Sequence, residues 1–73
     1  MDGYEKLANS IIIRAAKDYR AALKKIRRNP GNRDAAETAV QCEEFFDSRW
    51  FSALTTVDGE WLKEKLRKEA AGA

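Results

Sequence analysis

The chain has 73 residues, of which 44% are hydrophobic and 36% are charged, and its formal net charge is +2. A chain of this length forms one domain with a thin hydrophobic core, so we expect a single helical domain over residues 1–73. It has no histidine and only one cysteine, which excludes histidine-dependent catalytic sets, an ordinary zinc site and an intrachain disulfide.

Charge is distributed unevenly along the chain. Residues 1–33 hold nine basic and three acidic side chains. Residues 34–60 hold one basic and seven acidic side chains, and residues 61–73 hold four basic and two acidic side chains. This order favours oppositely charged helices that pack side by side. A nucleic-acid-binding domain that is basic throughout would have a different pattern, and the two basic flanks also argue against an acidic mimic of DNA.

The first predicted element is a long helix over residues 4–28, a segment without proline and rich in alanine, leucine, lysine and arginine. Residues at helical spacing form one apolar face: Leu7, Ala8, Ile11, Ile12, Ala15, Tyr19, Ala22, Leu23 and Ile26. The opposite face is basic and carries Lys6, Lys17, Arg20, Lys24, Arg27 and Arg28. Ile13 falls among these basic side chains and does not fit the apolar face.

The second predicted element is a helix over residues 33–48. Pro30 and Gly31 predict a turn, and Asn32 is a good N-cap for the helix that follows. A link this short favours an antiparallel α-hairpin. One arc of this helix is mostly apolar and contains Ala35, Ala36, Ala39, Val40, Cys42, Phe46 and Trp50. We interpret Cys42 as a buried core residue.

The third predicted element is a helix over residues 56–70. Thr55 and Asp58 have the spacing of a capping box at its start, and its apolar side carries Trp61, Leu62 and Leu66. The segment between the second and third helices, "SRWFSAL", is predicted to be a corner. The fold class predicted from these elements is all-α, as a compact three-helix domain.

The segments "ANSIIIRAAKDYRAAL", "RNPGNRDAA" and "EEFFDSRWFSALTTVDGEWL", in this order, resemble a group of small uncharacterised proteins encoded in prophages and mobile elements of Gram-positive gut bacteria. The resemblance spans about Ala8 to Glu69 and assigns no activity to any residue. It implies an accessory protein that inhibits or modulates a host system, a class that includes anti-CRISPR-type inhibitors.

The segment "EEFFDSRWFSAL" concentrates aromatic side chains and is the candidate binding site. Helical spacing places Phe46 and Trp50 on the core arc, whereas Phe45 points away from it and Phe51 lies at the corner. Aromatic residues and arginine supply most of the binding energy at protein interfaces. We predict a partner-binding surface made of Ile13, Phe45, Arg49, Trp50 and Phe51. The expected partner is another protein, such as a bacterial defence or replication component, or a second copy in a homo-oligomer.

The basic face of the first helix supports an alternative function, a nucleic-acid-binding accessory protein. The residues that would follow a phosphate backbone are Lys17, Arg20, Lys24, Arg27 and Arg28. Base stacking on this face is not expected, because Tyr19 faces the apolar side.

The acidic side chains Glu37, Glu43, Glu44 and Asp47 are interpreted as a solvated or partner-facing surface rather than a metal site. Glu43 falls inside the apolar arc, so we expect it to pair with a basic group of the first or third helix or to face a partner.

The sequence contains no glycine-rich phosphate-binding loop. We therefore predict no enzymatic activity, no cofactor and no metal. The apolar run Ile11–Ile13 is much shorter than a secretory signal or a membrane span. We expect a protein of the bacterial host cytoplasm without membrane association.

Overall fold

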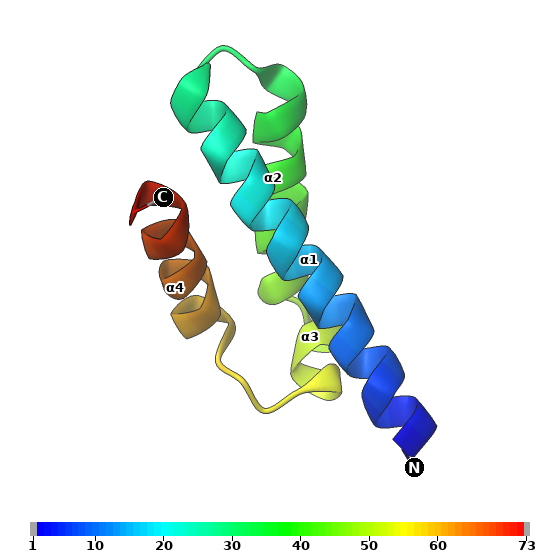
Figure 1. The fold of residues 1–73 in the computed structure, drawn as a ribbon. Helices are drawn as coiled ribbons and strands as arrows, with labels where there is room; N and C mark the ends of the chain where they lie inside the picture. Colours follow the sequence, from blue (N-terminus) through cyan, green and yellow to red (C-terminus); the bar gives the residue numbers. More distant parts are fainter. Residues whose placement is uncertain (1, 73) are drawn as a thin grey trace.

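The computed structural model describes residues 2–72, and this part of the chain contains four α-helices (Figure 1). They are α1 (Asp2–Arg28), α2 (Arg33–Phe46), α3 (Arg49–Leu54) and α4 (Gly59–Gly72). The all-α prediction is confirmed. The predicted count of three helices is wrong by one, because α3 occupies the segment that was predicted to be a corner.

Helices α1 and α2 form the predicted antiparallel hairpin, and α4 runs alongside α1 in the same direction (Figure 1). The turn begins after Asn29, whose N–H donates to the carbonyl of Lys25 (2.9 Å). The side chain of Asn32 accepts a hydrogen bond from the Ala35 N–H (3.0 Å). Asn32 is therefore the N-cap of α2, as predicted.

Helix α3 exists because Ser48 ends one helix and begins the next. The Ser48 hydroxyl donates to the Phe45 carbonyl at the end of α2 (2.6 Å) and accepts from the Phe51 N–H (3.1 Å). The backbone of Ser48 is extended, so the helical phase of α2 does not continue into α3. Helix α2 accordingly ends at Phe46, two residues before the predicted end.

The capping box predicted at Thr55 is wrong. Thr55 is the C-cap of α3, and its hydroxyl accepts from the Val57 N–H. The side chain of Asp58 accepts from the Glu60 N–H (2.9 Å), and its carbonyl accepts from the Leu62 N–H (3.0 Å). Asp58 therefore caps α4, which begins at Gly59, three residues later than predicted.

The hydrophobic core lies between α1, α2 and α4, and α3 closes one end of it (Figure 1). Its buried residues are Tyr19, Ala22, Ala39, Cys42, Phe46, Phe51 and Leu66. The rings of Tyr19 and Phe46 (5.7 Å) and of Phe46 and Phe51 (5.5 Å) meet edge to face, a favourable arrangement for aromatic pairs.

Several side chains differ from their predicted positions. Leu7 and Val40, both predicted to be apolar-face residues, are exposed. Trp50 was predicted to lie in the core and is 59% exposed, whereas Phe51, predicted to lie at the surface corner, is 1% exposed. The break at Ser48 explains this exchange, because the helical wheel of α2 cannot be extended past it.

Gly59 lets α4 approach the end of α2 closely. A Cβ atom at this position would lie 2.2 Å from the carbonyl oxygen of Phe46, far inside van der Waals contact. Glycine is required at this position because any side chain would collide with the backbone of α2.

Candidate protein-binding surface

A shallow apolar cleft lies between α1 and α2, on the side of the hairpin away from α4. We call it the α1–α2 cleft, and its volume is about 280 Å³. Its lining residues are Ile11, Arg14, Ala15, Asp18, Gln41, Cys42, Phe45 and Trp50. The carbon-rich members form the floor, whereas Arg14, Asp18 and Gln41 provide polar groups. This arrangement of an apolar centre and a polar rim is typical of protein interfaces.

Trp50 lies at one end of the cleft and is held there by aromatic packing. Its ring meets the ring of Phe45 edge to face at 5.6 Å. Phe45 is half-buried and also meets Phe46 and Phe51 at 5.6 Å. The exposed indole therefore rests on side chains that are anchored in the core. A large side chain that is already ordered loses little conformational freedom when a partner covers it.

The structure brings together only part of the predicted partner-binding set. Phe45 and Trp50 line the cleft, and Arg49 is exposed beside Trp50 at the start of α3. Phe51 is almost fully buried in the core, so it cannot touch a partner while the domain is folded. Its prediction as an anchor is corrected for this reason.

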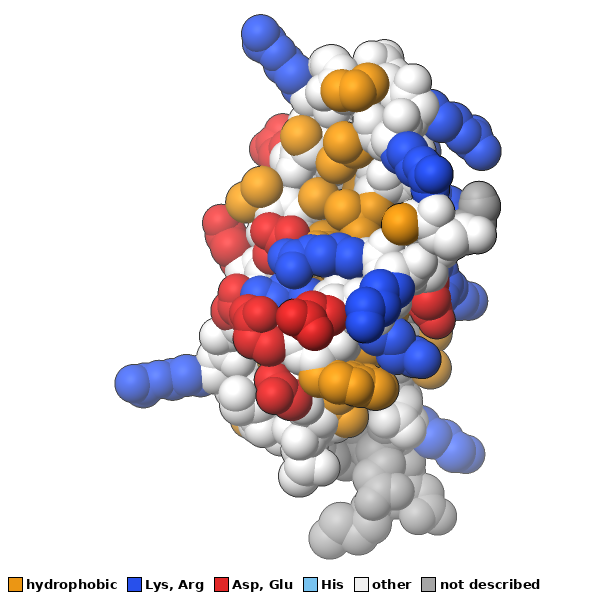
Figure 2. Space-filling model, turned by 90° about the vertical axis from the view of Figure 1, so that its left-hand side faces the viewer, with side chains coloured by type: hydrophobic (Ala, Val, Ile, Leu, Met, Phe, Trp, Pro, Cys, Tyr) orange, Lys and Arg blue, Asp and Glu red, His pale blue; other side chains and the backbone are white. Residues whose placement is uncertain are grey.

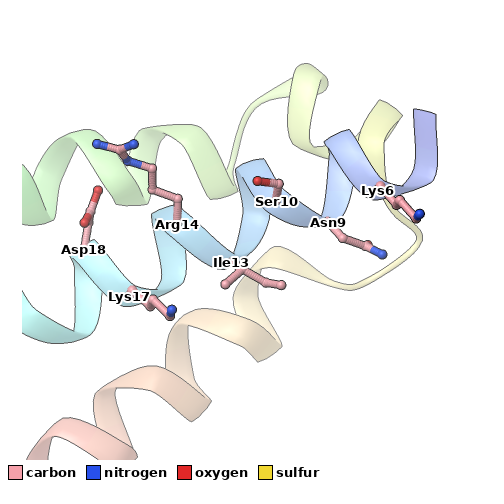
Figure 3. Close-up of a pocket in the computed structure, with 7 residues that line it drawn as sticks. All are labelled: Lys6, Asn9, Ser10, Ile13, Arg14, Lys17 and Asp18. Carbon is pink, nitrogen blue, oxygen red and sulfur yellow. The ribbon is translucent and has the colours of Figure 1, made fainter. Parts of the chain in front are cut away.

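Ile13 is 53% exposed but belongs to a different surface. It lies in a shallow hollow along α1, with a volume of about 540 Å³ (Figure 3). In Figure 3 its side chain points away from the α2 side, where the Arg14 side chain lies. Arg14 and Asp18 line both hollows and separate them. Ile13 and Trp50 therefore do not form one continuous site.

Ile11, Ala15 and Cys42 are cleft residues that the sequence assigned to the core. Helical spacing correctly placed them on the inner faces of the hairpin. It could not show that the helices leave a gap on one side, because α4 covers only the other side.

Burial raises the pKa of the Cys42 thiol, and the carboxylates of Asp18 and Glu43 add to this effect. Cys42 is therefore a poor nucleophile at neutral pH.

The opposite side of the hairpin, which faces α4, is joined by ion pairs. Figure 2, which views the molecule from the α4 side, shows acidic and basic side chains next to one another across its middle. Arg67 donates to the Tyr19 hydroxyl (3.0 Å) and to Glu43 (3.3 Å), and Tyr19 donates to Glu43 (2.7 Å). The expectation that Glu43 pairs with a basic group of the last helix is confirmed.

Lys63 is a second link between α4 and α2 and is almost completely buried. Its ammonium group donates to both carboxylate oxygens of Asp47 (2.8 and 2.9 Å) and pairs with Glu60 (2.6 Å). These hydrogen bonds raise the pKa of Lys63. Burial of this lysine is compatible with its charge because both of its anionic partners are in direct contact with it.

Replacement of Tyr19 by phenylalanine is expected to lower stability at neutral pH by about 1 kcal/mol, the net value of a typical hydrogen bond. Burial, followed by the hydrogen bond to Glu43, raises the pKa of Tyr19 above its ordinary value of 10.0, although Arg67 opposes this shift. The folded state thus holds the phenol proton more tightly than the unfolded state. The resulting stability is fully present below pH 10.0 and is lost as pH rises through the folded-state pKa.

Urea unfolding of the wild type and Tyr19→Phe at neutral and alkaline pH checks this expectation. The wild type should lose stability above pH 10.0, and the variant should lose less over the same range. Lys63, whose pKa is also raised, contributes a loss of the same sign in both proteins. Equal losses in the two proteins would contradict the role assigned to the Tyr19 hydroxyl.

The basic face of α1 is partly used to hold α4. Arg20 pairs with Glu69 (2.9 Å), and Arg27 donates to the carbonyls of Ala70 and Ala71 at the C-terminal end of α4. Lys24, Arg27 and Arg28 line a hollow near this end, and Lys17 is exposed farther along α1. The five predicted phosphate-contacting residues therefore do not form an independent stripe.

The residues of the predicted acidic surface fall into two groups, one paired with α4 and one exposed to solvent. Glu43 and Asp47 pair with α4 as described, whereas Glu37 and Glu44 are exposed. Among the side chains that the structure describes, no group of three or more histidine, cysteine, aspartate or glutamate residues is arranged to hold a metal ion.

None of the helices in the described part of the chain is both long enough and apolar enough to cross a membrane. Comparison of the chain with protein-family models, curated proteins and solved structures found no match.

Proposed function

We propose that this chain is a non-catalytic protein-binding module and that the α1–α2 cleft, with Trp50 at its end, is its binding surface. The observation that carries the proposal is the 59% exposure of Trp50 beside an apolar floor. Tryptophan is among the residues that contribute most to protein interfaces. Arg49, next to Trp50 and exposed, provides a further contact.

The ionisable groups with shifted pKa values support a binding role over catalysis. Tyr19, Lys63 and Arg67 are joined to carboxylates in the contacts that fix α4 on the hairpin. Cys42 is the one such group in the cleft, and burial keeps it in the thiol form. The cleft therefore offers apolar area for contact, and its one thiol is a poor nucleophile.

The resemblance to small phage and mobile-element proteins supplies the proposed setting. In this setting the module works in the bacterial cytoplasm and inhibits or modulates a host protein, such as a defence or replication component. An anti-CRISPR-type inhibitor is one form of this function. The alternative, nucleic-acid binding by α1, is less well supported because Arg20 and Arg27 are engaged with α4.

Replacement of Trp50 by alanine is expected to weaken partner binding by about 2 kcal/mol or more, which is roughly a 30-fold increase in Kd. The matched control is Trp61→Ala, because Trp61 is similarly exposed (55%) but lies on α4. Wild-type, Trp50→Ala and Trp61→Ala proteins would be used as baits in lysate of a Gram-positive gut bacterium. The Kd of each captured protein would then be measured with purified components.

We expect specific partners to bind the wild type and Trp61→Ala and to be lost with Trp50→Ala. Circular dichroism of each bait would establish that the helices are retained. Partners that bind all three baits with equal affinity would refute the assignment of the cleft as the binding surface.

A further inference from the structure

The charged residues at the edges of the α1–α2 cleft differ from those that face α4, because they have no ion-pair partner among the side chains that the structure describes. On the α1 edge the exposed charges are mainly basic, and on the α2 edge they are mainly acidic, with Arg33 as the exception. The basic set is Arg14, Lys17 and Lys25. The acidic set is Asp34, Glu37 and Glu44. Asp18, one turn from Arg14, is the exception on α1.

Helical spacing connects these residues to the cleft. Gln41 lines the cleft, and Glu37 and Glu44 lie four residues before it and three residues after it, on the same side of α2. Arg14 also lines the cleft, and Lys17, three residues later, lies beyond Arg14 on the outer side of α1, in the hollow around Ile13. The cleft therefore has an apolar floor between one basic edge and one acidic edge.

Opposite charges also lie at matching heights on the two helices. The hairpin turn joins Arg28 to Arg33, so residues equally far from the turn lie side by side. Lys17 and Glu44 are equally far from it, and Lys25 and Glu37 differ by a single residue. A basic side chain on α1 therefore lies at nearly the same height as each of these acidic side chains on α2.

This pattern makes the surface complementary to itself under one symmetry operation. A two-fold axis parallel to the helices places α1 of one copy over α2 of the other, antiparallel and at the same height. Each basic edge then faces an acidic edge, and the contact occurs twice because the interface is isologous. A two-fold axis across the helices would instead place α1 over α1 and bring like charges together.

We infer that a second copy of this chain occupies the α1–α2 cleft and forms a symmetric dimer with α1 of each copy packed on α2 of the other. The inference rests on the proposed function, since it uses the same binding surface and names the occupant of that surface in the isolated protein. The dimer covers Phe45 and Trp50. It also supplies apolar burial that a chain of 73 residues lacks by itself.

Two charge-reversal variants test the inference. In the first, Glu37→Lys and Glu44→Lys make both edges basic. In the second, Lys17→Glu and Lys25→Glu make the α1 edge acidic. All four positions are exposed and outside the ion pairs of the described residues, so both variants should fold, which circular dichroism would check.

Sedimentation velocity at low salt, from micromolar to millimolar protein concentration, is the measurement. The wild type should dimerise, and each variant alone should dimerise at least tenfold more weakly, because its copies bring like charges together. An equimolar mixture of the two variants should recover a one-to-one heterodimer with affinity near that of the wild type. In this heterodimer both halves of the interface again join opposite charges.

A third variant separates this effect from general attraction between molecules of different net charge. Lys65→Glu with Lys68→Glu changes net charge as the second variant does, but on exposed positions of α4. It should dimerise like the wild type, and its heterodimer with Glu37→Lys/Glu44→Lys should be weaker than the wild-type dimer, because only one half of that interface joins opposite charges. A control heterodimer as tight as the wild-type dimer would overturn the inference.

Two other outcomes would also overturn it: a wild type that stays monomeric throughout, or a dimer unaffected by either reversal. The proposed function is judged separately, by the Trp50→Ala and Trp61→Ala baits. A monomeric wild type whose partners are lost with Trp50→Ala would refute the dimer alone. A dimer with the expected charge dependence, and with partners unaffected by Trp50→Ala, would refute the binding role toward other proteins alone.

Discussion

Replacement of Phe51 by alanine is expected to lower the free energy of unfolding by about 3–5 kcal/mol, the usual cost of removing a buried phenylalanine ring. Phe51 is 1% exposed, and its ring meets those of Phe45 and Phe46 at 5.6 and 5.5 Å. A domain of this size has a total stability of roughly 4–11 kcal/mol. The substitution should therefore remove a large share of the stability of the domain, which urea unfolding followed by circular dichroism would show.

The matched control for Phe51→Ala is Trp50→Ala, one residue earlier in the same helix. Because Trp50 is largely exposed, its loss should cost about 1 kcal/mol, the value of its edge-to-face contact with Phe45. Phe51→Leu should recover part of the lost stability because it refills most of the volume. A Phe51→Ala protein as stable as Trp50→Ala would mean that Phe51 is a surface residue, as the sequence alone suggested.

Replacement of Gly59 by alanine is expected to destabilise the domain by about 2–3 kcal/mol, in the range of core overpacking. The added Cβ would lie 2.2 Å from the Phe46 carbonyl oxygen and 3.1 Å from its carbonyl carbon. Both atoms belong to the backbone at the end of α2 and cannot rotate away. Helix α4 would have to move, which weakens its contacts with the hairpin. At about 4–8 °C per kcal/mol for a small domain, the melting temperature should fall by roughly 8–24 °C.

Gly72→Ala is the control for this substitution, because it lies in the same helix and a Cβ there would meet nothing within 4 Å. Its stability should stay within about 0.5 kcal/mol of the wild type. Alanine normally favours helices over glycine by about 1 kcal/mol. A Gly59→Ala protein that is stabilised would therefore mean that helix propensity, and not contact with α2, governs this position.

Local sequence signals predicted much of the fold because they act over a few residues. The turn at Pro30 and Gly31 and the N-cap at Asn32 were found in this way, and periodicity identified Tyr19 and Phe46 as core residues. Such signals could not decide between competing local solutions. Thr55 and Asp58 can both cap a helix, and the structure uses Asp58 for α4 and Thr55 for the end of α3.

The candidate site was predicted less well than the fold. The aromatic segment was correctly located, but Trp50 was predicted to be buried and is exposed, whereas Phe51 was predicted to be exposed and is buried. The reason is that the Ser48 cap ends α2 and begins α3 with a different helical phase. The α1–α2 cleft itself was not predicted. Its existence depends on which side of the hairpin α4 covers, and no single helix contains that information.

By itself, the sequence determined the all-α class, the hairpin and the separation of charge between its two helices, since periodicity, capping and composition act locally. Only the tertiary structure decided where each charge is used. It placed α4 on one side of the hairpin, where Gly59 permits close approach and Lys63 and Arg67 reach the acidic groups of α2. It left the other side uncovered, with Trp50 at its end. The physical reason is that α4 can cover only one side of a two-helix layer, so the opposite side keeps its exposed apolar surface and unpaired edges.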